Sequence, residues 1–261
     1  MPLSRPDRNP SGPSTLHRSL EPIAGSLWIL FAIWTVIVAV VWIGGWGIAL
    51  AGDEPVPHAE LKAAFAFVFK LLDATWILLA GANVYLALAA TEGLAGARRW
   101  AGTILLAALF VGLLSRLTHV PLGPITFPSR LGVQIFGIPF GYPLIWLIVV
   151  VGGRDLVARF LPRASHLQIA LLTGLLAAGS MWMMEPVARE DRAWWLWREG
   201  RTVLPAPVQN FLTWGVLSSV LAYLYRPRLV PLPSSERWKI PATWAAVHAV
   251  FLFRHAVRIL T

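Results

Sequence analysis

The stretch from Ile23 to Leu50 contains no charged residue. An α-helix rises 1.5 Å per residue, so about 20 apolar residues are enough to cross the hydrocarbon core of a bilayer. This stretch exceeds that length, and further apolar runs follow it along the chain. The pattern predicts an all-α protein, a polytopic integral membrane helical bundle.

The composition agrees with a membrane protein. Hydrophobic residues make up 57%, charged residues 13%, and the mean hydropathy is +0.64, against roughly 45–50% apolar and about 25% charged residues in soluble domains. So few charges cannot cover a water-exposed surface, which excludes a soluble domain. The net charge of +9 is spread over the segments between apolar runs, as in proteins facing anionic lipid headgroups, so we expect no nucleic-acid partner.

Seven apolar runs predict about seven transmembrane helices. The fourth run is interrupted by proline and glycine, and the seventh is the weakest because Arg254, His255 and Arg258 lie near its end. The residues before Ile23 form a polar Pro/Ser-rich tail, 1–22, followed by a transmembrane domain, 23–261. The runs are Ile23–Leu50, Ala63–Thr91, Ala101–Leu117, Gly132–Val151, Leu167–Met184, Val203–Tyr225 and Pro241–Leu260.

Lys and Arg are slightly more frequent in the segments on the same side as the N-terminus. Cytoplasmic loops carry an excess of these residues, so we expect a cytoplasmic N-terminus. The chain has no cysteine, which rules out thiolate zinc sites, iron–sulfur clusters and cysteine nucleophiles. His119, His248 and His255 are too far apart in the sequence to predict a metal site.

A charge within an apolar run or at its end needs a partner or water. Lys70 and Asp73 are three residues apart, which places them on one helix face. They form either a proton-handling pair at a cavity or an ion pair that satisfies itself. Glu185 ends the fifth run beside Trp182. It is either a poorly hydrated general acid or a helix-end carboxylate that faces lipid headgroups.

The segment from Phe136 to Pro143 is unusual at membrane depth, because it combines two prolines with two glycines. Irregular backbone is tolerated there only when protein shields it or when it lines a cavity. We therefore predict a kinked or broken fourth span that borders an internal cavity near Asn210. The 14 tryptophans are explained mainly by interfacial aromatic belts, although a few can instead stack along a polyene.

Several short blocks occur in an order and spacing that resemble the membrane carotenoid-biosynthesis proteins, including the carotenoid 1′,2′-hydratases and bisanhydrobacterioruberin hydratase. The resemblance covers roughly residues 100 to 225. The chain departs from the family pattern at Glu185-Pro186, which replaces Asp-Pro, at Ser115-Arg116, which replaces an acidic residue, and at Ile125 and Phe127, which replace tyrosines. The matching blocks are Pro121–Pro124 with Leu131–Gly132, Phe136–Pro139 with Pro143–Trp146, Glu185–Ala188, Trp195–Trp197 and Pro207–Trp214.

The resemblance implies the addition of water to the terminal C1′=C2′ double bond of an acyclic carotenoid, without a cofactor or metal. Glu185 would be the acid, and Asp73 or Asn210 would orient the water. Tryptophan faces would stabilise the cation. The residues expected to bind substrate are Lys70, Pro139, Gly141, Trp146, Trp182, Trp195, Trp197 and Trp214.

The alternative is a non-catalytic membrane subunit that holds carotenoid or lipid within a larger complex. The acidic residue lost at Ser115 favours this alternative, whereas Glu185 and Asn210 favour the enzyme. In either case the expected partners are a carotenoid or another isoprenoid and the membrane lipid itself. The expected location is the membrane of a bacterial or archaeal cell.

Overall fold

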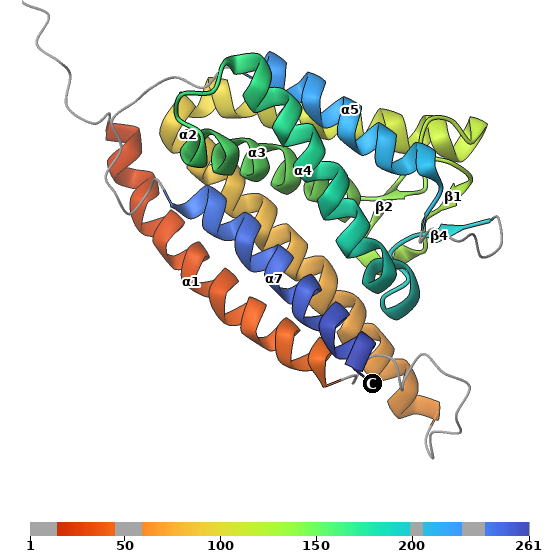
Figure 1. Ribbon diagram of the computed structural model, residues 1–261. Coiled ribbons are helices and arrows are strands. Elements are labelled where there is room, and N and C mark those ends of the chain that lie inside the picture. The colour runs from red at the N-terminus through yellow and green to blue at the C-terminus, as the bar shows by residue number, and fades with distance from the viewer. Residues whose placement is uncertain (1–14, 45–58, 199–205, 226–237, 261) are drawn as a thin grey trace, which may run out of the picture.

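A computed structural model of the protein describes residues 15–44, 59–198, 206–225 and 238–260, without the side chains of residues 15–21, 59–66, 69 and 70. This part of the chain is mostly helical (Figure 1). Its helices are α1 (Thr15–Ile43), α2 (Ala59–Thr118), α3 (Gly141–Phe160), α4 (His166–Pro186), α5 (Val208–Leu224) and α7 (Lys239–Leu260).

Helix α3 forms the centre of the bundle, and it contacts α2, α4, α5 and α7. Every residue from Gly141 to Arg154 is buried. A helix that is apolar on all sides is stable only when other elements surround it. Helices α1 and α7 and the first half of α2 lie side by side, and α4 and α5 pack together on the other side of α3 (Figure 1).

Four helical segments in the described part of the chain are long and apolar enough to cross a membrane: Pro22–Ile43, Leu71–Thr118, Gly141–Phe160 and His166–Asp191. Helix α5 is apolar but shorter. The polytopic helical class is therefore confirmed, whereas the number of seven spans stays a prediction. Helix α1 begins at Thr15, so it extends into the segment predicted as a tail, of which residues 1–14 lie outside the described residues.

The second and third apolar runs both belong to α2, which bends at Gly93. This residue has φ 74° and ψ 165°, a conformation outside the helical region. Glycine reaches positive φ without the steric cost that a Cβ atom imposes. Gly93 therefore lets the chain reverse between two helical halves without a separate loop.

The fourth apolar run differs from the prediction of a broken helix. Its first part is a hairpin of β2 (Gln134–Ile135) and β3 (Ile138–Pro139), and the helix that follows is continuous. Pro143 lies in the first turn of α3, where an amide hydrogen has no partner within the helix. The prolines and glycines therefore lie in the hairpin before the span and in its first turn, and they do not interrupt the helix in its middle.

A second strand pair lies beside the start of α5 (Figure 1). Strand β1 (Ile125–Thr126) pairs antiparallel with β4 (Leu196–Trp197), and a 3-10 turn, η1 (Ser129–Leu131), follows β1. At this end of the bundle α2 and α4 end, and α3 and α5 begin. We call it the loop end, and both Glu185, in the last turn of α4, and Asn210, in the first turn of α5, lie here.

Candidate functional site

Glu185 lies in the last turn of α4 and is fully buried, with 0% of its surface exposed. Each carboxyl oxygen accepts a hydrogen bond from an indole N–H. Trp195 Nε1 donates to Oε2 over 3.0 Å, and Trp197 Nε1 donates to Oε1 over 2.5 Å. Two tryptophans from the segment after α4 thus fix the orientation of one buried acid.

This segment returns to Glu185 through a π-helical turn, η2 (Val187–Asp191). The amide of Trp194 donates to the carbonyl of Ala188 over 2.8 Å, which folds the chain back on itself. Strand β4 then pairs with β1, with Trp197 opposite Ile125. The loop after α2 and the segment after α4 therefore support each other and hold the tryptophans in place.

Aromatic rings pack around this acid. Tyr142 and Trp146 lie one turn apart on α3, and Trp214 of α5 stacks on Trp146 with ring centroids 3.7 Å apart. Tyr142 makes edge contacts with both Trp195 and Trp214, at 6.3 and 6.4 Å. The aromatic cluster of Tyr142, Trp146, Trp195, Trp197 and Trp214 joins three segments that are far apart in the sequence.

Three buried polar atoms lie at this end of α3 and α5: Tyr142 Oη, Trp146 Nε1 and Asn210 Nδ2. In the described part of the chain none of them has a hydrogen-bond partner. Both helices start at the loop end. Asn210 lies one turn before Trp214 on α5, and Tyr142 lies one turn before Trp146 on α3. Buried polar groups are nearly always hydrogen-bonded, often to a water molecule. These three groups are therefore suited to hold water or a polar ligand atom.

Asp73 is the second buried carboxylate, and four N–H groups surround it. Arg192 donates to both oxygens, at 2.8 and 2.9 Å, and Trp194 and Trp42 each donate one indole N–H, at 2.9 and 3.2 Å. A carboxylate offers about four lone-pair positions. Asp73 thus has its full set of partners within the protein.

The predicted partner of Asp73 was Lys70, which lies one turn earlier in α2. The side chain of Lys70 falls outside the described residues, so the Lys70–Asp73 pair stays a prediction. The pair with Arg192 escaped sequence analysis because the two residues are 119 positions apart. The sequence does show that Arg192 stands two residues before the Trp194-Trp195 pair, and this proximity is the feature that could have drawn attention to Arg192.

Not every predicted substrate-binding residue joins the aromatic cluster. Trp182 is 51% exposed on the outer side of α4 and packs against Phe211. Pro139 is buried in β3 opposite Gln134. A Cβ atom on Gly141 would lie 3.0 Å from the Cβ of Leu131, so protein packing fills the space beside this glycine.

Ser115 and Arg116, where the family resemblance led us to expect an acidic residue, have structural partners. Ser115 is fully buried, and its hydroxyl accepts a hydrogen bond from the amide of Leu122 over 2.9 Å. Arg116 Nη1 donates to the carbonyl of Phe136 over 2.6 Å, at the tip of the β2–β3 hairpin. Both side chains therefore support the loops at the loop end.

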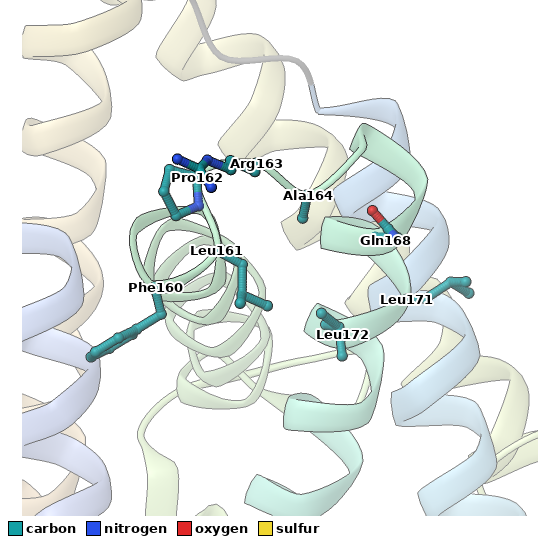
Figure 2. A pocket seen from close by; sticks show the side chains of 8 residues that line it. All are labelled: Phe160, Leu161, Pro162, Arg163, Ala164, Gln168, Leu171 and Leu172. Atoms are coloured by element: carbon teal, nitrogen blue, oxygen red, sulfur yellow. The ribbon is translucent and has the colours of Figure 1, made fainter.

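A further cavity lies away from this cluster. It measures about 830 Å³ and lies at the turn between α3 and α4, where Leu161 and Leu172 face the space between the helices and Arg163 and Gln168 lie at its rim (Figure 2). This turn is at the opposite end of α4 from Glu185. Its residues therefore take no part in the cluster around the acid.

The fold and site define an integral membrane protein of the helical-bundle class, with a buried acid inside an aromatic cluster. The family model described as "Carotenoid biosynthesis protein" matches residues 72–261. The chain therefore belongs to the carotenoid biosynthesis protein family, which confirms the family resemblance and extends it to α7. Searches of curated proteins and of solved structures find no match. The family membership supports a role in carotenoid biosynthesis.

Proposed function

We propose that the protein catalyses the acid-driven addition of water to the terminal C1′=C2′ double bond of an acyclic carotenoid. The observation that carries this proposal is the setting of Glu185. Its carboxyl is fully buried, is held by two indoles, and lies at the same end of the bundle as three polar atoms without partners. An acid, aromatic faces and a water-binding group are what this reaction needs.

The reaction begins when the Glu185 carboxyl transfers its proton to C2′, which leaves a tertiary cation at C1′. Aromatic faces attract cations through their negative π-surface, so the cluster around Tyr142 and Trp195 stabilises this charge. A water molecule then bonds to C1′ and releases a proton to the Glu185 carboxylate. The net change is the addition of one water, and the acid is regenerated.

Within this proposal, Asn210 is the better candidate for orienting the water. Asp73 already accepts four hydrogen bonds, so binding a water there would displace one of its N–H partners. Asn210 is buried and its Nδ2 has no partner among the described residues. We assign Asp73 the structural role of anchoring Arg192 and Trp194, which positions the neighbouring Trp195.

A non-catalytic carotenoid-binding subunit is the second candidate. The observation in its favour is that Ser115 and Arg116, where the resemblance implies an acidic residue, are engaged in loop contacts. Such a protein would bind pigment through the same aromatic cluster but would leave its chemistry unchanged. The two candidates differ in whether a tertiary alcohol is formed.

The deciding experiment uses a host that makes lycopene, with and without the protein. Glu185→Gln keeps the shape of the side chain and can still accept from an indole, but it cannot supply the proton. We expect the wild type to form hydroxylated carotenoid, and Glu185→Gln to lower its rate by about 10²–10⁴-fold while the protein still accumulates. Mass spectrometry of extracted pigments measures the product.

Asp155→Asn is the control, because Asp155 is a carboxylate that pairs with Arg159 within α3, far from the aromatic cluster. It should retain most of the activity. Normal product from Glu185→Gln would show that another group is the acid. Wild-type protein that retains lycopene but forms no alcohol, with several acyclic carotenoids tried, would favour the non-catalytic subunit.

A further inference from the structure

The cavity at the turn between α3 and α4 has no part in the proposed reaction, and its walls can be reached from outside the protein. Its volume of about 830 Å³ is within the range of small-molecule sites. Phe160, Leu161 and Leu171 line it and are 74%, 45% and 52% exposed. Leu161 and Leu172 face the space between the two helices (Figure 2). A ligand in this cavity therefore meets apolar surface that the protein leaves uncovered.

The position of the cavity along the spans follows from how α3 and α4 are joined. Both helices belong to segments that are long and apolar enough to cross a membrane, and only residues 161–165 separate them. Two spans joined by so short a turn run in opposite directions, so the turn lies where the spans leave the hydrocarbon core. Leu171 and Leu172 lie about 4–6 Å beyond Gln168 along the axis of α4, toward the acyl chains.

The rim of the cavity carries one cation, Arg163, and the lining residues include no acid. Arg163 is exposed, and its guanidinium makes no ion pair or hydrogen bond with the residues that the structure describes. Gln168 lies at the same rim, where its Oε1 accepts from the amide of Ser165 over 2.7 Å. Its amide NH2 group is left as a donor. The rim therefore offers a positive charge and an N–H donor above apolar walls.

The other charges at this end of the bundle, where α3 and α5 end and α4 and α7 begin, do not neutralise Arg163. Asp155 pairs with Arg159 over 2.7 Å, and Glu92 is buried. Among the side chains described at this end, the cations thus outnumber the acids, as suits a surface that faces anionic lipid. The cations are Arg98, Arg99, Arg154, Arg159, Arg163 and Lys239, and the acids are Glu92 and Asp155.

Apolar walls below a cationic rim match an amphiphile with an anionic head. A hydrocarbon would leave Arg163 without a counter-ion, a free anion would leave the apolar walls uncovered, and a zwitterionic headgroup would bring a second cation close to Arg163. We propose that the cavity binds an anionic phospholipid whose phosphate pairs with Arg163 and whose acyl chain lies against Leu161 and Leu172. The Gln168 amide donates to the same headgroup. Because Glu185 lies at the other end of α4, this proposal does not depend on the hydration reaction.

The test titrates the full-length protein in detergent with phosphatidylglycerol or with phosphatidylcholine of the same acyl chains, and native mass spectrometry counts the bound lipids. One arginine near a membrane surface attracts an anionic lipid enough for about a fivefold preference. We expect the wild type to bind its first phosphatidylglycerol about fivefold more tightly than phosphatidylcholine. Arg163→Gln should abolish this preference and leave phosphatidylcholine binding unchanged. Arg98→Gln is the matched control, because Arg98 is an exposed arginine at the same end that does not line the cavity, and it should keep the preference.

Two further measurements separate a phospholipid from other occupants. Leu172→Trp fills the space between the helices, so it should weaken the first binding step of both lipids. Glycerol 1-phosphate, a headgroup without chains, should not displace phosphatidylglycerol at millimolar concentration. Displacement by this headgroup would show that the cavity takes a free anion and would overturn the assignment. Equal affinity of the wild type for the two lipids would also overturn it, as would the same loss of preference in Arg163→Gln and Arg98→Gln.

Discussion

Trp194 and Trp195 are neighbours in the sequence, yet their indole N–H groups bind different carboxylates. Trp194 donates to Asp73 and Trp195 to Glu185, and the two rings meet edge to face at 6.1 Å. One dipeptide therefore links the structural carboxylate to the proposed acid. A displacement at Asp73 should consequently be transmitted to Glu185 through the backbone of Trp194 and Trp195.

The first prediction at this scale concerns the buried pair of Asp73 and Arg192. Asp73→Ala removes the carboxylate that accepts two hydrogen bonds from the buried Arg192 guanidinium, so we expect a loss of about 3–5 kcal/mol in the free energy of unfolding. Asp73→Ala combined with Arg192→Leu removes both charges and should recover much of that loss. Denaturant titration of the protein in mixed micelles measures the difference. Equal stability of the single and double variants would mean that the pair contributes no coupling.

The second prediction concerns the indole of Trp197. Trp197→Phe keeps an aromatic ring but removes the N–H that donates to Glu185 Oε1. A hydrogen bond to a charged group is worth about 1.5–3 kcal/mol, so we expect formation of the alcohol to fall roughly tenfold or more.

The matched control is Trp182→Phe, because Trp182 lies outside the aromatic cluster and is half-exposed on α4. It should leave both activity and stability close to those of the wild type. If the two variants behaved alike, the bond to Glu185 would have no role in the reaction.

How much of the site could be predicted depends on how local its contacts are. Glu185 and Asn210 stand out in the sequence because each belongs to a short block that carries the resemblance to the family. Arg192 and Tyr142 do not, because their roles arise from contacts with segments far away in the chain. A single sequence favours the nearby Lys70 as the partner of Asp73, since only local spacing is visible in it.

At the scale of elements, hydropathy predicts the helices but not how they are joined. The apolar runs correspond to real helices, yet Gly93 unites two of them within α2. Proline and glycine correctly indicate irregular backbone near residue 140. They do not indicate whether the irregular part interrupts the helix or precedes it, because proline is tolerated in a first turn and in an edge strand alike.

The third prediction concerns the β2–β3 hairpin. Its two turn residues, Phe136 and Gly137, have φ values of 52° and 77°, as a two-residue turn with both central residues left-handed requires. A Cβ atom on Gly137 would also collide with the Arg116 guanidinium, which binds the carbonyl of Phe136. Gly137→Ala should therefore lower the free energy of unfolding by about 1–2 kcal/mol or more.

Comparing the double variant Gly137→Ala with Arg116→Ala against Arg116→Ala alone separates the two causes. Both of these proteins lack the collision and the hydrogen bond to Phe136, so they differ only in the backbone strain at residue 137. Phe136→Gly is the matched control and should be tolerated, since glycine adopts positive φ freely. Thermal unfolding followed by circular dichroism compares these variants with the wild type. A fully stable Gly137→Ala would show that this turn does not require glycine.

At the scale of the whole molecule, the charges that weaken the seventh apolar run connect the last turns of α7 to the end of α4 and to η2. Arg254 Nε donates to Asp191 over 2.6 Å, and Arg258 pairs with Glu190 and donates to the carbonyl of Pro186 over 2.9 Å. A hydropathy scale treats these arginines as unfavourable in a membrane span, because it does not take account of their partners, which lie 63 to 72 residues away. The same contacts hold η2, the turn that directs the tryptophan segment back to Glu185.

The last prediction follows from this attachment. Arg254→Met leaves the largely buried Asp191 with only the more distant Arg258, at 3.7 Å. We expect a loss of about 2 kcal/mol in the free energy of unfolding and a fall in alcohol formation, because η2 loses one of its anchors. Exchanging the charges, with Arg254→Asp and Asp191→Arg together, should restore part of both the stability and the alcohol formation.

The control is Arg159→Met, which removes an ion pair with Asp155 within α3, far from the loop end, and should affect the reaction little. Stability that falls without any change in product would show that α7 supports the bundle but does not position the acid.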